Sequence, residues 1–224
     1  MAIISDQIQE ACDKAGRKKE SVKTMVVTKN HGFEVTKMAY EHGFRLFGEN
    51  RIQETQEKYA QNHGLSLELH MIGHLQSNKA KIACELCSCI QSIDKIKTLL
   101  EVQKQAKNLD KVQDVMFQIN TSLEDSKSGV RDINELWPLI DQACHCPNIK
   151  VIGLMTIGPF DAPEKKIRRC FSDLRELGNR IISRYPGINL KDLSMGMSDD
   201  FHLAIAEGAT LLRLGRILLG ERYA

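Results

Sequence analysis

Short apolar runs alternate with longer amphipathic stretches along almost the whole chain. The first run, Met25, Val26, Val27 and Thr28, is apolar and largely β-branched, which predicts a buried strand. Further runs of the same character recur at intervals that leave room for a helix between them. Together they predict strands over residues 23–28, 45–48, 68–72, 89–92, 114–119, 150–155, 192–195 and 211–214.

The stretches between these runs show the helical spacing of apolar residues. Residues 3–15 place Ile4 and Ile8 on one face, which predicts an amphipathic helix before the first strand. Gly43 and Gly208 each follow a helical stretch, as expected of residues that end helices in the left-handed conformation. Further helices are expected over residues 34–42, 53–62, 77–85, 95–106, 133–144, 164–185 and 199–207.

Alternation of strands and helices without hairpin signals predicts parallel strand pairing. Eight strands in 224 residues predict an α/β fold, a single closed (β/α)₈ TIM barrel with an extra amino-terminal helix and no second β domain. An open doubly wound sheet is the alternative. Polar residues after many of the strands favour the barrel, because its rim collects such residues whereas an open sheet has its site at one switch point. They are Lys29, Glu49, Asn50, His74, Asn120, Thr156, Ser194 and Arg213.

Composition narrows the classes of function. Hydrophobic residues make up 42% of the chain and charged residues 27%, the proportions of an ordinary soluble protein. A net charge of +2 gives no electrostatic reason to expect a nucleic-acid or membrane partner. The start of the chain has no signal-peptide core, and no apolar run approaches the roughly 18 residues of a membrane span. We therefore expect a cytoplasmic protein.

The seven cysteines are odd in number and unevenly spaced, which argues against a disulfide framework. A zinc site is the alternative, because Cys84, Cys87, Cys144 and Cys146 form two close pairs with His145 nearby. However, the segment that holds Cys84 and Cys87 is predicted to be helical, whereas structural zinc usually draws its ligands from loops or knuckles. Reduced thiols and no metal site are therefore expected.

Lys29 continues the apolar face of Met25 and Val27 at the end of the first strand, where a lysine must reach solvent, pair or react. Two glycine-containing stretches, residues 193–198 and 213–216, follow the seventh and eighth predicted strands. In barrels, these two loops often bind phosphate through backbone N–H groups. The chain therefore places a candidate reactive amine and a candidate phosphate site on one rim.

The residues of these two stretches suit an anion. Gly196 and Gly215 would let the backbone approach it closely, and Ser194 and Ser198 would add hydroxyl donors. A structural turn is the alternative reading of either stretch taken alone. Together with the lysine, they predict a ligand that carries both an aldehyde and a phosphate.

Pyridoxal 5′-phosphate (PLP) has this chemistry. A lysine forms its Schiff base, and a second protein group meets its pyridine nitrogen. Arg213 shares a strand face with Leu211 and Gly215 and could reach that ring. Because arginine keeps its protons, it would hold the pyridine nitrogen unprotonated and weaken the ring as an electron sink.

Longer motifs extend this interpretation. They comprise residues 27–29 (VTK), 47–50 (FGEN), 70–79 (HMIGHLQSNK), 127–129 (KSG), 153–156 (GLMT), 193–200 (LSMGMSDD) and 213–215 (RLG). With these motifs the chain resembles the pyridoxal-phosphate homeostasis proteins, a family similar to the barrel domain of bacterial alanine racemases. The resemblance implies one PLP-binding domain over residues 1–224, with the cofactor on Lys29. It also implies Asn50 near the ring, Arg213 at the ring nitrogen, and Ser194, Gly215 and Arg216 at the phosphate.

Some positions depart from the family's pattern, including residues 216–219 (RILL), where the family more often has TAIF. Thr28 stands where serine is usual, Asn30 where threonine is common, and Arg216 where the family more often has a threonine. The last change removes a hydroxyl donor from the expected phosphate site and leaves the backbone N–H and the guanidinium. The departures bear on the affinity for PLP rather than on its identity.

The resemblance implies a monomeric protein that holds PLP and serves PLP homeostasis, affecting amino-acid and keto-acid balance indirectly. PLP-dependent apoenzymes are expected as transient recipients. Efficient catalysis is not expected, because racemases with this barrel take an opposing tyrosine from a second domain. Tyr40, Tyr59 and Tyr185 are expected on helices or their ends, and Tyr223 lies at the terminus. A weak PLP-dependent amino-acid racemase or lyase is the alternative, and a lysine-dependent aldolase of sugar phosphates is a third possibility.

Overall fold

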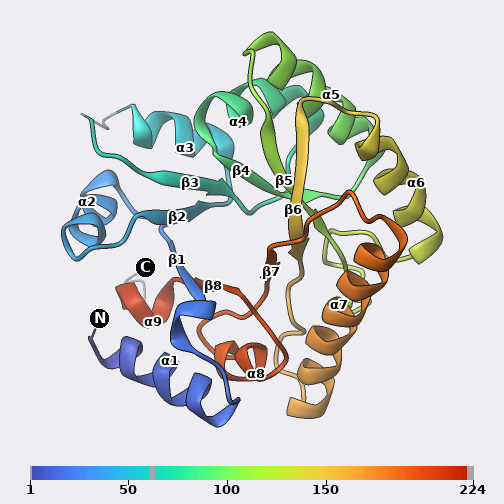
Figure 1. The fold of residues 1–224 in the computed structure, drawn as a ribbon. Coiled ribbons are helices and arrows are strands. Elements are labelled where there is room, and N and C mark those ends of the chain that lie inside the picture. Colours follow the sequence, from blue (N-terminus) through green and yellow to red (C-terminus); the bar gives the residue numbers. More distant parts are fainter. Residues whose placement is uncertain (1, 61–63, 221–224) are drawn as a thin grey trace.

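In the computed structural model, which describes residues 2–60 and 64–220, eight parallel strands close into a barrel (Figure 1). Each strand pairs with its neighbours in the sequence, and β8 pairs with β1 to complete the ring. The predicted TIM barrel is therefore confirmed. The strands are β1 Lys23–Val27, β2 Leu46–Glu49, β3 Glu68–Met71, β4 Cys89–Ile93, β5 Gln113–Gln118, β6 Ile149–Met155, β7 Asp192–Ser194 and β8 Leu211–Leu214.

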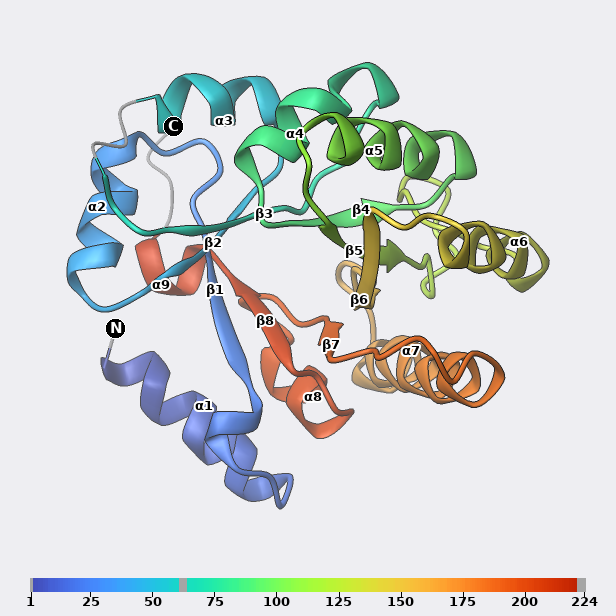
Figure 2. The ribbon, with the colours of Figure 1, turned by 45° about the horizontal axis from the view of Figure 1, so that its top comes forward.

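Helices surround most of the barrel on its outside (Figure 2). The α-helices are α1 Ala2–Lys14, α2 Phe33–Glu41, α3 Ile52–Tyr59, α4 Ala80–Leu86, α5 Ile96–Asn108, α6 Ile133–Cys144, α7 Glu164–Arg184, α8 Phe201–Ala206 and α9 Arg216–Leu219. Two short 3₁₀ helices, η1 Lys19–Ser21 and η2 Ser77–Lys79, precede β1 and α4. No helix within the described ranges is long and apolar enough to cross a membrane.

All eight predicted strands are present, and each of their ends lies within one residue of its predicted position. The helix predicted over residues 77–85 is present, but its first turn is not α-helical. That turn is the 3₁₀ helix η2, a conformation that is common at the starts of α-helices. The predicted helix over residues 53–62 is described from Ile52 to Tyr59, and its residues 61 and 62 lie outside the described residues.

The helix predicted over residues 199–207 begins later than expected, at Phe201. The Asp200 carboxylate accepts a hydrogen bond from the Met197 N–H at 2.6 Å. The Asp200 N–H in turn donates to the Met197 carbonyl at 3.2 Å. These two bonds hold residues 197–200 in a turn, so the helix can start only after it.

An apolar layer fills the inside of the barrel. Met25, Cys89, Met116 and Leu211, from four different strands, are buried and pack together. Gly48 on β2 faces this layer, since a β-carbon there would lie 2.5 Å from the Met25 sulfur. The layer therefore leaves no space for a side chain at position 48. A larger apolar cluster lies between the strands and the surrounding helices.

The predicted amino-terminal helix packs on the outside of the barrel, against α8. Ile4 and Ile8 of α1 are buried in the main core. Just after this helix, Arg17 donates hydrogen bonds to the carbonyl oxygens of Ile205 at 2.9 Å and Ala209 at 2.7 Å. These bonds tie the start of the chain to the end of α8 and to the turn that leads into β8.

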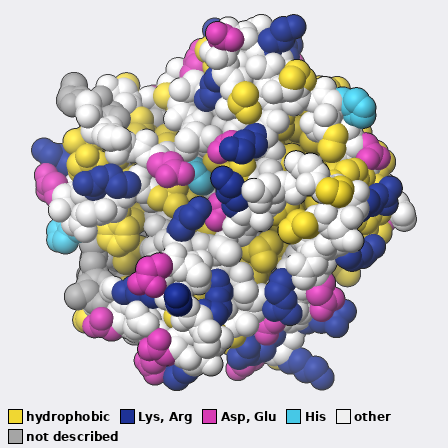
Figure 3. All heavy atoms as spheres, viewed as in Figure 1, with side chains coloured by type: hydrophobic (Ala, Val, Ile, Leu, Met, Phe, Trp, Pro, Cys, Tyr) yellow, Lys and Arg dark blue, Asp and Glu magenta, His cyan; other side chains and the backbone are white. Residues whose placement is uncertain are grey.

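Charges of both signs are distributed over the surface. Figure 3 shows basic and acidic side chains interspersed over the face seen in Figure 1. Many of the exposed ion pairs join residues on one helix, such as Lys14 with Glu10 at 2.7 Å and Arg169 with Asp173 at 2.8 Å. Exposed pairs of this kind each contribute at most about 1 kcal/mol. Most of the stability therefore comes from the two apolar clusters.

Candidate cofactor-binding site

Lys29 lies in a tight turn directly after β1. The His31 N–H donates to the Thr28 carbonyl at 3.1 Å and closes the turn around the lysine. Asn30 adopts the left-handed conformation there, with a φ of 62°. Asparagine tolerates this conformation much better than a β-branched residue does. The asparagine that departs from the family's pattern therefore suits the backbone of this chain.

A buried polar cluster lies behind the turn. The Glu49 carboxylate accepts hydrogen bonds from Thr28 Oγ1 at 2.7 Å and from Lys58 Nζ at 2.6 Å. The same Lys58 ammonium donates to the Thr28 carbonyl at 2.9 Å. The Tyr59 hydroxyl also reaches Glu49, at 3.4 Å. The peptide that precedes Lys29 is thus anchored by a buried ion pair, for which the sequence pattern carries no signal.

Burial shifts the pKa values of Lys58 and Tyr59 in this cluster. It lowers the pKa of Lys58, and the neighbouring Glu49 charge opposes that shift. Burial also raises the pKa of Tyr59, and the Glu49 charge adds to the rise. The phenol therefore stays protonated over the physiological range. It acts as a hydrogen-bond donor rather than as a base.

Asn50 directly follows β2 on the same rim. Lys29 follows the neighbouring strand β1, because Val27 of β1 pairs with Gly48 of β2 in parallel register. The Asn50 Oδ1 atom is buried and has no hydrogen-bond partner. A buried acceptor without a partner is costly unless a ligand or water pairs with it. Asn50 therefore marks a position where a donor is expected.

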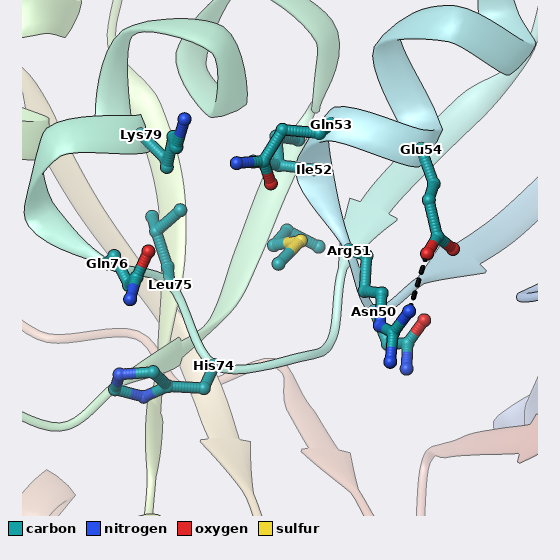
Figure 4. Close-up of a pocket in the computed structure, with 10 residues that line it drawn as sticks. Asn50, Arg51, Ile52, Gln53, Glu54, His74, Leu75, Gln76 and Lys79 are labelled. Atoms are coloured by element: carbon teal, nitrogen blue, oxygen red, sulfur yellow. Dashed lines mark hydrogen bonds and ion pairs between the residues drawn. The ribbon is translucent and has the colours of Figure 1, made fainter.

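A cavity of about 260 Å³ opens beside Asn50, between the loops that follow β2 and β3 (Figure 4). Arg51 and Glu54 form an ion pair of 2.7 Å on one side of it, and His74 and Lys79 line the other side. His74 is exposed at the rim, where the sequence placed it. The cavity therefore adds basic and amide groups next to Asn50.

Arg213 is a charged residue buried inside the barrel. Its side chain points inward from β8 and is 5% exposed. Nη1 donates to Ser194 Oγ at 2.8 Å, and Nη2 donates to the Thr156 carbonyl at 2.7 Å. Burial lowers the pKa of Arg213 to about 10, and the charge of Asp200 opposes the shift. The guanidinium therefore keeps its charge at neutral pH.

The two glycine-containing loops meet at the ends of β7 and β8. Gly196 has a φ of 94°, and a β-carbon there would lie 2.6 Å from the Ala204 β-carbon, so the turn requires glycine. The Ile217 N–H donates to Ser198 Oγ at 3.2 Å and joins the loops. Arg216 forms an ion pair with Asp199. Both loops therefore present closely spaced backbone groups on the rim.

Six of the seven residues predicted for the site lie at the ends of β8, β1 and β2 or in the loop after β7, a consecutive arc of the barrel. They are Lys29, Asn50, Ser198, Arg213, Gly215 and Arg216. Ser194 lies deeper. Its hydroxyl donates to Gln91 Oε1 at 2.6 Å and accepts from Arg213, and the residue is fully buried. The contact between Ser194 and a phosphate stays a prediction, and in this structure the hydroxyl proton points to Gln91.

Metal-binding and thiol groups do not contribute to this arc. Among the described residues there is no group of three or more histidine, cysteine, aspartate or glutamate side chains that could hold a metal ion. All seven cysteines are free thiols, and Cys144 alone is exposed. The four cysteines weighed as zinc ligands are therefore not arranged as a metal centre.

Comparison with known proteins agrees with this geometry. The profile described as alanine racemase, N-terminal domain, matches residues 3–223. The pyridoxal phosphate homeostasis protein of Aquifex aeolicus is 41% identical over 219 residues, which cover 98% of this chain and 95% of that protein. The protein of the same name from Vibrio cholerae is 38% identical over 225 residues, covering 98% of this chain and 93% of the relative.

Solved structures of the same two groups of proteins resemble this chain in fold. PipY of Synechococcus elongatus, determined with PLP bound, has a TM-score of 0.85 and 32% identity, covering 95% of this chain and 100% of that one. The alanine racemase of Streptomyces coelicolor has a TM-score of 0.79 at 16% identity, and 56% of its chain is covered. Fold and site thus define a barrel of the alanine racemase type. Within that class, the chain belongs to the pyridoxal phosphate homeostasis protein family.

Proposed function

We propose that this chain binds PLP through a Schiff base with Lys29 and takes part in PLP homeostasis. The observation that carries the proposal is that Lys29 directly follows β1 while the buried Arg213 lies on β8, the strand that pairs with β1. The parallel pairing of Met25 with Arg213 establishes that these strands are neighbours. The relative with PLP bound and the homeostasis proteins that match the full chain support it.

The residues of the arc fit this cofactor. The orphaned Asn50 Oδ1 offers an acceptor on the same rim as the lysine. Gly215 allows β8 to pass close to β1, because a β-carbon there would lie 3.2 Å from the Val27 carbonyl oxygen. The phosphate would lie against the backbone of Gly215 and Arg216 and the Ser198 side of the neighbouring loop. When bound, PLP supplies an aldehyde for the Schiff base and a ring that withdraws electrons.

The role of the protein is to hold this group rather than to turn over a substrate. Arg213 would donate a hydrogen bond to the ring nitrogen and leave it unprotonated, which weakens electron withdrawal. Two of the tyrosines that could act as a second acid/base are already bonded elsewhere, Tyr59 to Glu49 and Tyr185 to Asp141 at 2.6 Å. Tyr223 lies outside the described residues.

The wider proposal is a single PLP-binding domain over residues 1–224 that acts as a monomer in the cytoplasm. PLP-dependent apoenzymes would be its transient recipients. The enzyme alternative, a weak racemase or lyase, predicts α-deuteration of an L-amino acid in deuterated water that depends on Lys29. No exchange above the rate of free PLP is expected.

The absorbance spectrum of the protein incubated with PLP tests the proposal. The wild-type chain should show the band of a bound Schiff base, and borohydride should fix one cofactor to the peptide that contains Lys29. Lys29→Ala should lose both signals, whereas Lys37→Ala, at an exposed position on α2, should keep them. A band of equal strength in Lys29→Ala would contradict the assignment of the lysine.

A further inference from the structure

A chain of side-chain hydrogen bonds crosses the barrel beneath the candidate site. This relay consists of Arg213, Ser194, Gln91, His70 and Glu68. Arg213 Nη1 lies 2.8 Å from Ser194 Oγ, and Ser194 Oγ lies 2.6 Å from Gln91 Oε1. Gln91 Nε2 lies 2.7 Å from His70 Nδ1, and His70 Nε2 lies 3.1 Å from Glu68 Oε1. The relay thus runs from the rim end of the barrel to the start of β3.

With a neutral His70 ring, the chemistry of the relay fixes the direction of every proton in it. The Glu68 carboxylate only accepts, so a neutral His70 must carry its proton on Nε2 and accept on Nδ1. Gln91 must then offer its NH₂ group to His70 and its carbonyl oxygen to the serine. Ser194 donates to that oxygen and presents its lone pairs to Arg213. Each group therefore donates toward Glu68, and the serine becomes an acceptor for the arginine.

The interior members of the relay have almost no contact with solvent that could replace these bonds. His70 is 3% exposed, and Gln91 and Ser194 are fully buried. A buried polar chain in a barrel otherwise filled by apolar side chains has to be satisfied at every link, because one broken link leaves an unpaired group on each side. A disturbance at His70 is thus transmitted to Ser194 and to Arg213.

We infer that Gln91 and His70 are positioning residues that act through Ser194 to orient Arg213 toward the cofactor ring. The inference rests on the proposed function, because Arg213 is the group that would meet the pyridine nitrogen. In this role, Ser194 holds the guanidinium of Arg213 in place. His70 of β3 and Gln91 of β4 then contribute to a site whose other residues come from β7, β8, β1 and β2. The electronic state of the bound ring should therefore depend on a glutamine that does not touch it.

Gln91→Met tests this, because methionine fills the same space without a hydrogen bond. The absorbance maximum of bound PLP should shift, and PLP should dissociate roughly two to ten times faster, as expected for one lost hydrogen bond. The matched control is Gln113→Met. Gln113 is also fully buried, but it donates to backbone carbonyls, including that of Ser88 at 2.9 Å, at the start of β5.

The control separates positioning from folding. Both methionine variants should lower the melting temperature, whereas only Gln91→Met should change the spectrum and the dissociation rate. An unchanged spectrum and rate in a folded Gln91→Met variant would overturn the inference. Combining Gln91→Met with His70→Phe should give little further change in the spectrum or the rate, because both substitutions break one chain. Additive effects of the two would also overturn it.

A second measurement determines which His70 ring nitrogen carries the proton when no PLP is bound. The ¹⁵N chemical shifts of His70 in the ligand-free wild-type chain should be those of a neutral ring protonated on Nε2. A ring protonated on Nδ1 would reverse the chain and overturn the inference. Absence of any Schiff-base band in the wild-type chain would instead contradict the proposed function. The two failures are therefore distinguishable.

Discussion

The ammonium group of Lys58 donates to the carbonyl oxygen of Thr28, 2.9 Å away, while also pairing with Glu49 at 2.6 Å. A helix on the outside of the barrel thereby holds the peptide immediately before Lys29. Both charged side chains are less than one tenth exposed, at 8% for Lys58 and 5% for Glu49. The position of the candidate reactive lysine thus depends on an ion pair that lies behind the strand.

Removing one partner of this pair should be costly. Lys58→Met leaves the Glu49 carboxylate buried without a cation, so the free energy of unfolding should fall by about 3–5 kcal/mol. Urea titration measures this, with the exposed Lys37→Met as the matched control and an expected change within about 0.5 kcal/mol. Adding Glu49→Gln to Lys58→Met should recover part of the loss. Equal losses in the two lysine variants would show that the pair is not stabilising.

Tyr59 should make the stability depend on alkaline pH. Its pKa is raised in the folded chain by burial and by the Glu49 charge, whereas the unfolded chain ionises near pH 10. The folded state therefore holds the proton more tightly, and this contribution is complete below about pH 10 and is lost as the pH rises further. Urea titrations at increasing pH should show a steeper decline for the wild type than for Tyr59→Phe. Parallel declines in both chains would refute this assignment.

The sequence predicted the strands and the arc of the site because both follow from local pattern. β-branched runs indicate strands, and the carboxyl ends of parallel strands meet on one rim, so Lys29, Asn50 and Arg213 could be grouped without coordinates. The sequence pattern does not reveal which side chains form hydrogen bonds with one another. Lys58 resembles any surface lysine of a helix, and Ser194 and Gln91 are 103 residues apart in the chain. The hydrogen bonds that orient the site therefore had to come from the structure.

Gly73 should tolerate no side chain. A β-carbon at this position would lie 2.1 Å from the carbonyl oxygen of Asn50, which is backbone and cannot move freely. Gly73→Ala should cost about 1–3 kcal/mol and should displace Asn50, so that PLP is retained less well. Gly187→Ala is the control, because no atom lies within 4 Å of its β-carbon position. Thermal melts and equilibrium dialysis against PLP measure the two effects, and identical behaviour of both variants would contradict the close approach.

Arg216→Thr should tighten PLP binding. Threonine would supply the hydroxyl donor that this chain lacks at the expected phosphate position, and one hydrogen bond to a charged group contributes about 1.5–3 kcal/mol. The lost ion pair with Asp199 is exposed and should change stability by less than about 1 kcal/mol. Fluorescence titration with PLP gives the affinity, and Arg216→Ala is the control for loss of the guanidinium alone. Weaker binding in both variants would assign the phosphate contact to the arginine.

The thiols should differ in reactivity. Cys144 is exposed, whereas the other six cysteines are buried. Burial raises the pKa of Cys84 to about 11, so that thiol is protonated as well as inaccessible at neutral pH. A thiol reagent should therefore modify a single cysteine in the native protein and all seven after unfolding. Rapid labelling of native Cys144→Ser would show that a second thiol is accessible.

Closure of the sheet also limits how this protein can bind a partner protein. Every strand of the ring has a neighbour on both sides, so the barrel offers no unpaired edge to which a foreign strand could add. A recipient enzyme would have to recognise helices and the loops of the rim instead. Those same loops surround the proposed PLP site, so a recipient docked on them would cover the opening of that site.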